Sequence, residues 1–443
     1  MNAMSSTPVS TLAKQLFSMT LPMLFGILSL MSFQLVDSAF IGQLGVLPLA
    51  AQGFTLPMQM IVIGLQVGLG IATTSLISKA LGANQEQYGK QLAGLVLLVG
   101  AVGVLVLCLL IWLLREPLLA LMGGAGSVMP IIELYWPWWL VSAWVGAMTY
   151  FFYSISRSNG NTMLPGVMMI VTSVANMVLD PIFIFTLDMG IVGAAVATIL
   201  SFLLALVLVA HKVWQNHWVS FDFASISVPK SLAELGHIMG PAMVSQLLPP
   251  ISSMLATKLI AGFGTAAVAA WAVGSRFEFF VIVTVLALTM SLPPMVGRLF
   301  GAKQFDEIQA LVKIAVVYVL VFQTAMALIT FLLATPIASL LSSEQDVVDI
   351  VTLHLLWVPL SLGPLGICML MVSVANALGK AYRGLTISAL RLFAFFLPCL
   401  WLGGELLGLT GIFIGAFIAN VLSGANAWWM YQRTMALVKR GGV

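Results

Sequence analysis

Long apolar runs fill most of the chain, and short stretches of glycine, proline or charged residues separate them. Runs such as residues 92–114 and 190–210 exceed the roughly 20 residues with which a helix crosses a hydrocarbon layer of ~30 Å. The pattern predicts an all-α polytopic membrane protein with twelve transmembrane helices. These spans cover about residues 15–44, 48–81, 91–114, 130–157, 163–186, 190–214, 233–262, 266–299, 310–335, 348–377, 384–404 and 408–433.

The first apolar run follows Lys14 and is longer than the core of a signal peptide. It also lacks a cleavage site of small residues, so we expect it to be a retained helix.

The pattern of the first half repeats in the second half, because a shift of 219 positions aligns the two without a gap. The shift places Pro22 on Pro241, Gly45 on Gly264, Gly82 on Gly301, Pro117 on Pro336 and Gly160 on Gly379. Each half has an even number of spans, so the second copy enters the membrane in the same orientation and the repeat is parallel. We predict an N-lobe over residues 1–214 (spans 1–6), a cytoplasmic linker over 215–232 and a C-lobe over 233–443 (spans 7–12). The two six-helix lobes are expected to face a central cavity.

Lysine and arginine fall almost entirely in every second connection and at the C-terminus, and the other connections contain only Arg115. Positive charge stays on the cytoplasmic side of a membrane, so both termini and the linker are assigned to the cytoplasm. The net charge of +3 then reflects topology and predicts no nucleic-acid partner.

The composition agrees with a membrane protein and offers no enzyme chemistry. It is 61% hydrophobic and 7% charged, with a mean hydropathy of +1.09. The three cysteines lie inside apolar spans without metal-like spacing, so we expect neither a disulfide nor a metal site. Phosphate-loop, zinc-protease and Ser/His/Asp patterns are not found, so we expect no enzyme and no cofactor. An ion gradient is left as the source of energy.

Asp37 is an acidic residue inside the first span, about seven residues or ~10 Å from its outer end. A carboxylate in a membrane span costs at least about 2.5–3.5 kcal/mol and usually faces a cavity or a partner. Gln34 and Ser38 flank it within one turn and are candidates for lining the substrate cavity. The alternative is a carboxylate that a neighbouring donor merely holds.

Asp180 lies about six residues before the outer end of span 5, in the same layer as Asp37. Thr172, Asn176 and Asp180 follow each other at a spacing of four, which places them on one helix face. We count Thr172 as a further cavity candidate. Pro181 has no N–H and leaves a backbone carbonyl free near the carboxylate. A helix-end acid near the outer headgroups is the alternative.

Tyr135 in span 4 and Thr198 in span 6 fall in this same outer layer of the first half. Each alone is ordinary in a span, and Tyr135 also suits the interfacial aromatic belt. Together with Asp37, Asp180 and Asn176 they supply what a proton or cation site requires. We therefore predict a coupling site in the N-lobe.

The second half lacks the first acid, because Asp37 aligns with Ala256. Lys258, Arg276 and Glu278 occupy outer parts of spans 7 and 8, where opposite charges are expected to pair; a cavity-lining role is the alternative.

Two further features of the spans bear on the mechanism. Pro22 and Gly26 interrupt the first helix and predict a hinge there. His237 and His354 lie near span ends, where we expect partly hydrated side chains and not metal ligands.

These features together resemble the multidrug and toxic compound extrusion (MATE) family over essentially the whole chain. The resemblance rests on twelve spans in two repeats, a first-helix proline followed by Asp-Ser-Ala-Phe-Ile-Gly at residues 37–42, and the paired loop segments 81–83 and 300–302. Within the family the chain looks most like the DinF branch. The resemblance implies that Asp37 and Asp180 form an N-lobe acid pair, with Asn176, Tyr135 and Thr198 as neighbours.

The NorM branch of the same family places coupling acids in helices 7 and 10. Here span 7 has no central acid, and span 10 has Asp349 only at its mouth. This departure argues against a sodium site of the NorM type.

The resemblance implies an antiporter that exports amphipathic, often cationic, drugs in exchange for protons and thereby confers drug resistance. We expect a monomer in the lipid bilayer whose coupling ion is H⁺, with Na⁺ as the alternative. Protonation of the acid pair is expected to drive substrate release. A lipid-linked oligosaccharide flippase of the same superfamily and a membrane-embedded enzyme are the competing hypotheses.

Overall fold

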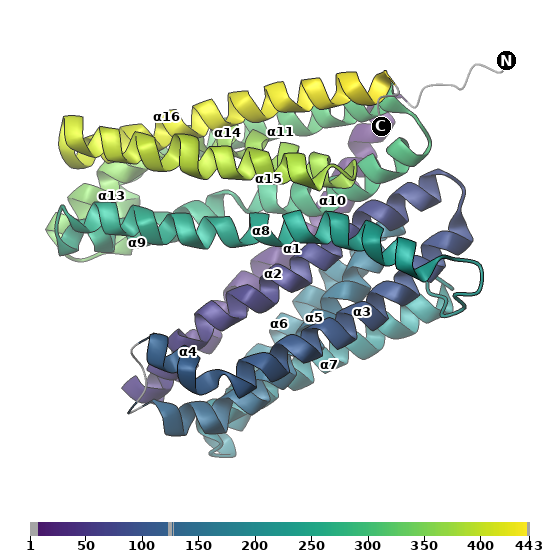
Figure 1. The fold of residues 1–443 in the computed structure, drawn as a ribbon. Helices are drawn as coiled ribbons and strands as arrows, with labels where there is room; N and C mark the ends of the chain where they lie inside the picture. The colour runs from purple at the N-terminus through teal and green to yellow at the C-terminus, as the bar shows by residue number, and fades with distance from the viewer. Residues whose placement is uncertain (1–7, 123–125, 127, 441–443) are drawn as a thin grey trace. The chain divides into compact units, whose positions relative to one another are not determined.

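The computed structural model describes residues 8–122, 126 and 128–440, and Figure 1 shows them as helices joined by short connections. No strand occurs among these residues. A lipid layer offers no hydrogen-bond partners, so an apolar segment of this length satisfies its backbone groups only as a helix. The all-α class predicted from the sequence is confirmed.

The first half of the chain contains seven α-helices and one short π-helical segment, η1, among the described residues. Their bounds are α1 Val9–Gln43, α2 Val46–Gly82, α3 Glu86–Leu113, α4 Arg115–Leu121, α5 Met129–Ser158, α6 Met163–Pro181, η1 Ile182–Thr186 and α7 Gly190–Gln215.

The second half repeats this order with more interruptions. Its bounds are α8 Val228–Ala261, α9 Thr265–Val281, α10 Val283–Gly301, α11 Phe305–Leu332, α12 Ala334–Leu341, α13 Gln345–Trp357, η2 Pro359–Ser361, α14 Leu362–Ala377, α15 Ala381–Ala389, η3 Leu390–Phe396 and α16 Leu397–Lys439.

Every predicted span lies within helical structure, although the helix bounds differ from the predicted ones. The span over 266–299 is divided between α9 and α10, and the last two spans are joined through Gly408, whose φ of 63° and ψ of −144° mark a kink. Nine of the described helical segments are long and apolar enough to cross a membrane, and one of them holds the last two spans.

The repeat seen in the sequence is also present in the helix bounds. The 219-position shift carries the start of α1 at Val9 onto the start of α8 at Val228, and residues 86–113 of α3 onto residues 305–332 of α11. The turns after α1 and α8 use Gly45 and Gly264, with φ of 114° and 105°. Only glycine adopts this backbone conformation readily, so the duplicated glycines preserve the same turn in both copies.

Internal contacts divide the chain into two compact units. The first unit comprises residues 18–243, and the second comprises residues 8–17 together with residues 244–440. The sequence predicts a division in the linker over 215–232, whereas the contacts divide the chain inside α1 and α8. The linker packs on the first unit, where the Gln91 side-chain amide donates to the Asp222 carbonyl over 2.7 Å and to Ser225 Oγ over 2.6 Å.

Glycine contacts hold α1 against α6 in the first unit. A Cβ added to Gly166 would lie 2.5 Å from the Pro22 carbonyl oxygen, and one added to Gly26 would lie 2.9 Å from the Met169 sulfur. Pro22 lies inside α1 and cannot donate a backbone hydrogen bond to the preceding turn. The predicted hinge therefore lies at a close contact between α1 and α6.

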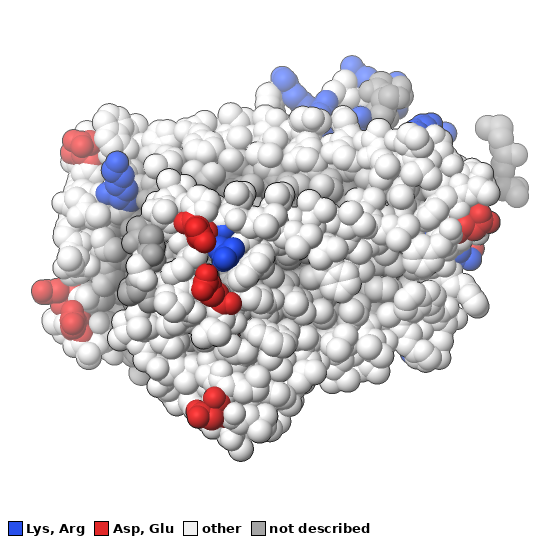
Figure 2. Space-filling model, turned by 60° about the horizontal axis from the view of Figure 1, so that its bottom comes forward, with Lys and Arg blue, Asp and Glu red and all other residues white. Residues whose placement is uncertain are grey.

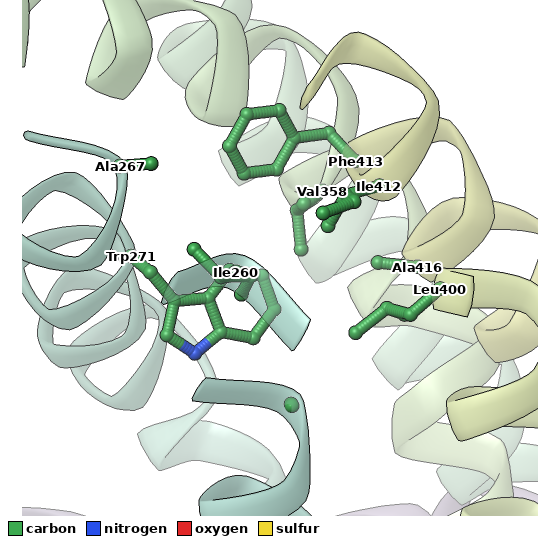
Figure 3. Packing of buried hydrophobic residues seen from close by; sticks show 9 residues of the cluster. Ile260, Ala267, Trp271, Val358, Leu400, Ile412, Phe413 and Ala416 are labelled. Carbon is green, nitrogen blue, oxygen red and sulfur yellow. The ribbon is translucent and has the colours of Figure 1, made fainter. Parts of the chain in front are cut away.

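The second unit has an aromatic and aliphatic core, which Figure 3 shows. It is formed by side chains of α8, α9 and α16 and by Val358, which directly follows α13. Trp271 stacks on Phe413 with ring centroids 6.3 Å apart and an interplanar angle of 17°. Ala256 is fully buried in the same cluster. The position aligned with Asp37 therefore belongs to an apolar core in the second copy.

Charged side chains are sparse on the face drawn in Figure 2, where broad areas carry neither blue nor red atoms. Large apolar side chains are exposed along most helices, for example Val102 of α3 and Val321 of α11. A surface of this kind suits contact with lipid tails.

We predict that Gly166→Ala destabilises the first unit, because the new methyl group would press on the backbone of Pro22. Overpacking of this kind costs about 1–3 kcal/mol. The unfolding temperature of the purified protein in detergent should fall. Gly103→Ala in α3 is the matched control, because nothing lies within 4 Å of its added Cβ. Equal unfolding temperatures for the two variants would contradict the predicted close contact.

Candidate functional site

The structure brings Asp37 and Asp180 together in the first unit. Asp180 occupies the last turn of α6 and is fully buried, whereas Asp37 of α1 is partly exposed. Their carboxyl groups lie within electrostatic range of each other. Asp37 lies 15 residues after Pro22, and Asp180 lies 14 residues after Gly166. α1 and α6 therefore approach each other at the glycine contacts and again at the acid pair.

The carboxyl oxygens of this pair have almost no hydrogen-bond donors among the residues that the structure describes. Both Asp180 oxygens and Asp37 Oδ1 are buried without a donor. Asp37 Oδ2 accepts one long hydrogen bond of 3.5 Å from the Gln52 amide of α2. Two carboxyl groups form a hydrogen bond only when one of them carries a proton, because ionised carboxylates are acceptors alone.

Asn176 and Thr198 form the neighbouring polar contact. The Asn176 amide, one turn before Asp180, donates to Thr198 Oγ1 of α7 over 3.1 Å, and that hydroxyl donates to the Ala194 carbonyl over 2.9 Å. Asn176 Oδ1 is buried and has no donor. The spacing of four along α6 thus places this amide and Asp180 on the same buried face, as predicted.

The remaining predicted residues are distributed unequally around the pair. Tyr135 of α5 is buried within electrostatic range of Asp37. Thr172 is buried further down α6, where its hydroxyl donates to the Met168 carbonyl of its own helix over 2.8 Å. Gln34 and Ser38 are exposed side chains of α1. The structure therefore places Tyr135 at the acid pair but gives no contact that joins Gln34, Ser38 or Thr172 to it.

The resulting site is a cluster of oxygen acceptors in an apolar surrounding. Asp37, Asp180 and Asn176 together present four buried oxygens without donors. A proton shared by the acids or a hard monovalent cation is the chemistry that would satisfy them. Among the described residues, no group of three or more His, Cys, Asp and Glu side chains is arranged to hold a metal ion.

The second unit carries different chemistry at the aligned positions. The 219-position shift places Asp37 on Ala256, Gln52 on Trp271, Tyr135 on His354, Asp180 on Cys399 and Thr198 on Phe417. Ala256, Trp271 and His354 are all buried there. The duplicated backbone therefore surrounds a coupling candidate in one unit and an aromatic core in the other.

Glu278 pairs with His354 and not with Lys258 or Arg276, so the expected ion pair among those three residues is wrong. His354 Nε2 lies 2.5 Å from Glu278 Oε1 and connects α13 to α9. Arg276 is two residues from Glu278, and residues at that spacing point in different directions on a helix. His354 is also fully buried and not partly hydrated as predicted. Gly274 leaves room for the ring, because a Cβ there would lie 2.7 Å from His354 Nε2.

Comparison with known proteins gives one family over most of the chain. A family model described as MatE matches residues 22–182 and again residues 241–402. The two matched segments are the two copies of the repeat.

Two characterised relatives and one solved structure cover almost the whole chain. The FAD transporter of Shewanella oneidensis is 30% identical over 97% of this chain and 96% of its own length. The multidrug export protein MepA of Staphylococcus aureus is 25% identical over 93% of this chain and 92% of its own. The crystal structure of the Vibrio cholerae MATE transporter VcmN in the bent form has a TM-score of 0.96 and 63% identity, covering 97% of this chain and 98% of that chain.

We predict that Thr198→Val lowers stability, because the Asn176 amide would lose its only recorded acceptor while the side-chain shape is kept. A buried donor without a partner costs about 1–3 kcal/mol. The unfolding temperature in detergent measures the loss. Thr198→Ser restores the hydroxyl and should recover most of it, and a Thr198→Val protein as stable as wild type would rule out the contact.

Proposed function

Because the chain belongs to the MatE family, the multidrug and toxic compound extrusion family whose members are transporters and not enzymes, we propose that it exports amphipathic organic molecules in exchange for protons. The observation that carries this proposal is the buried pair of Asp37 and Asp180. Their oxygens lack donors from the protein, so the pair suits a proton that arrives from outside. Sodium is the alternative coupling ion, because the same acceptors suit a small cation.

The two acids have different roles in this mechanism. Asp37 is partly exposed and receives the proton, whereas buried Asp180 holds the second carboxyl group beside it. Two carboxylates at close range in an apolar surrounding repel each other, and one shared proton removes this repulsion. Protonation therefore removes an electrostatic repulsion between α1 and α6.

The hinge at Pro22 and Gly26 converts this change into movement of α1. Pro22 weakens the backbone ladder of α1, and the glycine contacts with Gly166 and Met169 leave α6 as the surface against which α1 bends. The ionised pair favours a bound cationic substrate, and the protonated pair releases it. Substrate binding and protonation thus compete for the same charge.

The transporter acts as a monomer in the bacterial inner membrane with both termini in the cytoplasm. The distribution of lysine and arginine supports this orientation. The substrates are amphipathic or cationic drugs, supported by the likeness to MepA.

Export of a flavin dinucleotide is the second candidate function. Its support is the relative named FAD transporter, which is more similar to this chain than MepA is, at 30% against 25% identity. The two candidates differ in substrate charge, because FAD carries two phosphates and typical drugs of this class are cations. Export of ethidium and of FAD from the same liposomes distinguishes them.

We predict that Asp37→Asn and Asp180→Asn each reduce export driven by a pH gradient to the level of protein-free liposomes. Each change removes a titratable group of the pair and keeps the side-chain size. The measurement is ethidium efflux from liposomes that contain the purified protein, with a pH gradient and a sodium gradient imposed separately.

Asp349→Asn is the control for this experiment, because Asp349 is an exposed acid that accepts a 2.7 Å hydrogen bond from Gln345. It should retain wild-type efflux. Proton-driven efflux at the wild-type rate in Asp37→Asn would exclude Asp37 as the coupling group. Efflux under the sodium gradient alone would identify sodium, and not the proton, as the coupling ion. If neither gradient drove efflux, the antiporter function would be excluded.

A further inference from the structure

Arg391 is a charged residue deep in the second unit that the acid-pair mechanism does not use. It lies in the π-helical segment η3, ten residues after α15 begins at Ala381. Ten residues correspond to about 15 Å along a helix, which is half of a ~30 Å hydrocarbon layer. A charge at such a depth is rare and is by default the mark of a functional site.

The Arg391 guanidinium group has no hydrogen-bond or ion-pair partner among the described residues. Its Nε atom is buried without an acceptor. Arg383 of α15, by contrast, donates to Thr434 Oγ1 over 2.7 Å. An arginine without an anion at this depth leaves donors that a ligand can satisfy.

Arg391 is partly exposed in the second unit, whereas its Nε atom is buried. It lies within electrostatic range of Cys368, a side chain of α14 that is 1% exposed. The helix α14 itself carries no charged residue. On α16, which packs against η3, Glu405 is 14 residues or ~21 Å further along the chain. No acid of these neighbouring helices is therefore placed to neutralise Arg391.

Further polar groups and the local backbone mark the same face. Ser388 precedes Arg391 by three residues and hydrogen-bonds Ser245 of α8 over 2.7 Å. The wide π-helical turn of η3 begins at Leu390. Such segments within α-helices occur frequently at functional sites. In the first copy the position aligned with Arg391 is Thr172, a residue of the polar stripe that ends at Asp180.

We propose that Arg391 is an anion-binding residue for transported substrates, and that these include amphipathic molecules with a phosphate or carboxylate group. A guanidinium group binds both groups through two parallel hydrogen bonds. Lipid headgroups lie at the membrane surface, about 15 Å from this depth, so the anion is part of a substrate. The proposal rests on the transport function proposed above and names a further class of substrate for it.

The test is a set of binding titrations with the purified full-length protein in detergent. Flavin mononucleotide and riboflavin share one ring system and differ in a phosphate group, and ethidium serves as the cation. Arg391→Gln should weaken flavin mononucleotide binding by about ten-fold or more, because it removes a charge-assisted contact. Riboflavin and ethidium should bind within about two-fold of wild type, since they carry no anionic group.

Two further variants separate charge from structure. Arg391→Lys keeps the positive charge and should retain part of the preference for flavin mononucleotide over riboflavin. Lys313→Gln removes a charge from an exposed residue of α11 and should leave all three affinities unchanged.

Three results would overturn the proposal. They are a wild-type protein without preference for flavin mononucleotide over riboflavin, an Arg391→Gln variant that keeps the preference, and a variant that loses all three ligands equally. Proton-driven efflux from liposomes is measured separately. If efflux fails while phosphate binding still depends on Arg391, the antiporter is wrong and the anion site stands.

Discussion

The packing of α1 on α6 is the constraint on which the candidate site depends. Gly166 lets the Pro22 carbonyl approach α6, and the two helices approach each other again at Asp37 and Asp180. A bulkier residue at Gly166 would push the two helices apart and would thereby separate the two acids. The same contact therefore supports stability, places two like charges together and lies at the hinge. In the proposed mechanism, this coupling of packing to charge would let one proton act on a whole helix.

Much of this arrangement is readable in the sequence, because lipid leaves few choices. The apolar runs predict the spans, since only helices satisfy a backbone in lipid. The spacing of four from Asn176 to Asp180 correctly predicts a shared helix face. The partners of polar groups are not readable in this way. Gln52 and the pairing of Glu278 with His354 depend on how separate helices pack, and no local pattern in the sequence encodes that contact.

The case of Arg391 is different, because the 219-position repeat of the sequence already places this arginine opposite Thr172. A comparison that starts from the charged residues of the first copy shows that Asp37 is replaced by Ala256, but it does not reveal a charge that is present only in the second copy. Glycines such as Gly45 and Gly264 keep the two backbones alike, so selection on chemistry acts on the side chains between them. One copy carries two acids within its helices, and the other carries a base. Duplication thus supplies two similar scaffolds with opposite charges, and in the proposed mechanism these charges would hold opposite ends of a substrate.

The charge of the substrate decides which part of the proton gradient drives export. Exchange of one proton for one monovalent cation moves no net charge, so only the pH difference contributes. An anion that leaves while a proton enters moves charge in the direction that an inside-negative potential favours, and each elementary charge gains about 2.3 kcal/mol per 100 mV. Anion recognition at Arg391 would therefore add the membrane potential to the driving force. A zwitterionic substrate lies between these limits, because its exchange for one proton would move a single charge. The acid pair and Arg391 would each hold one of its two charges.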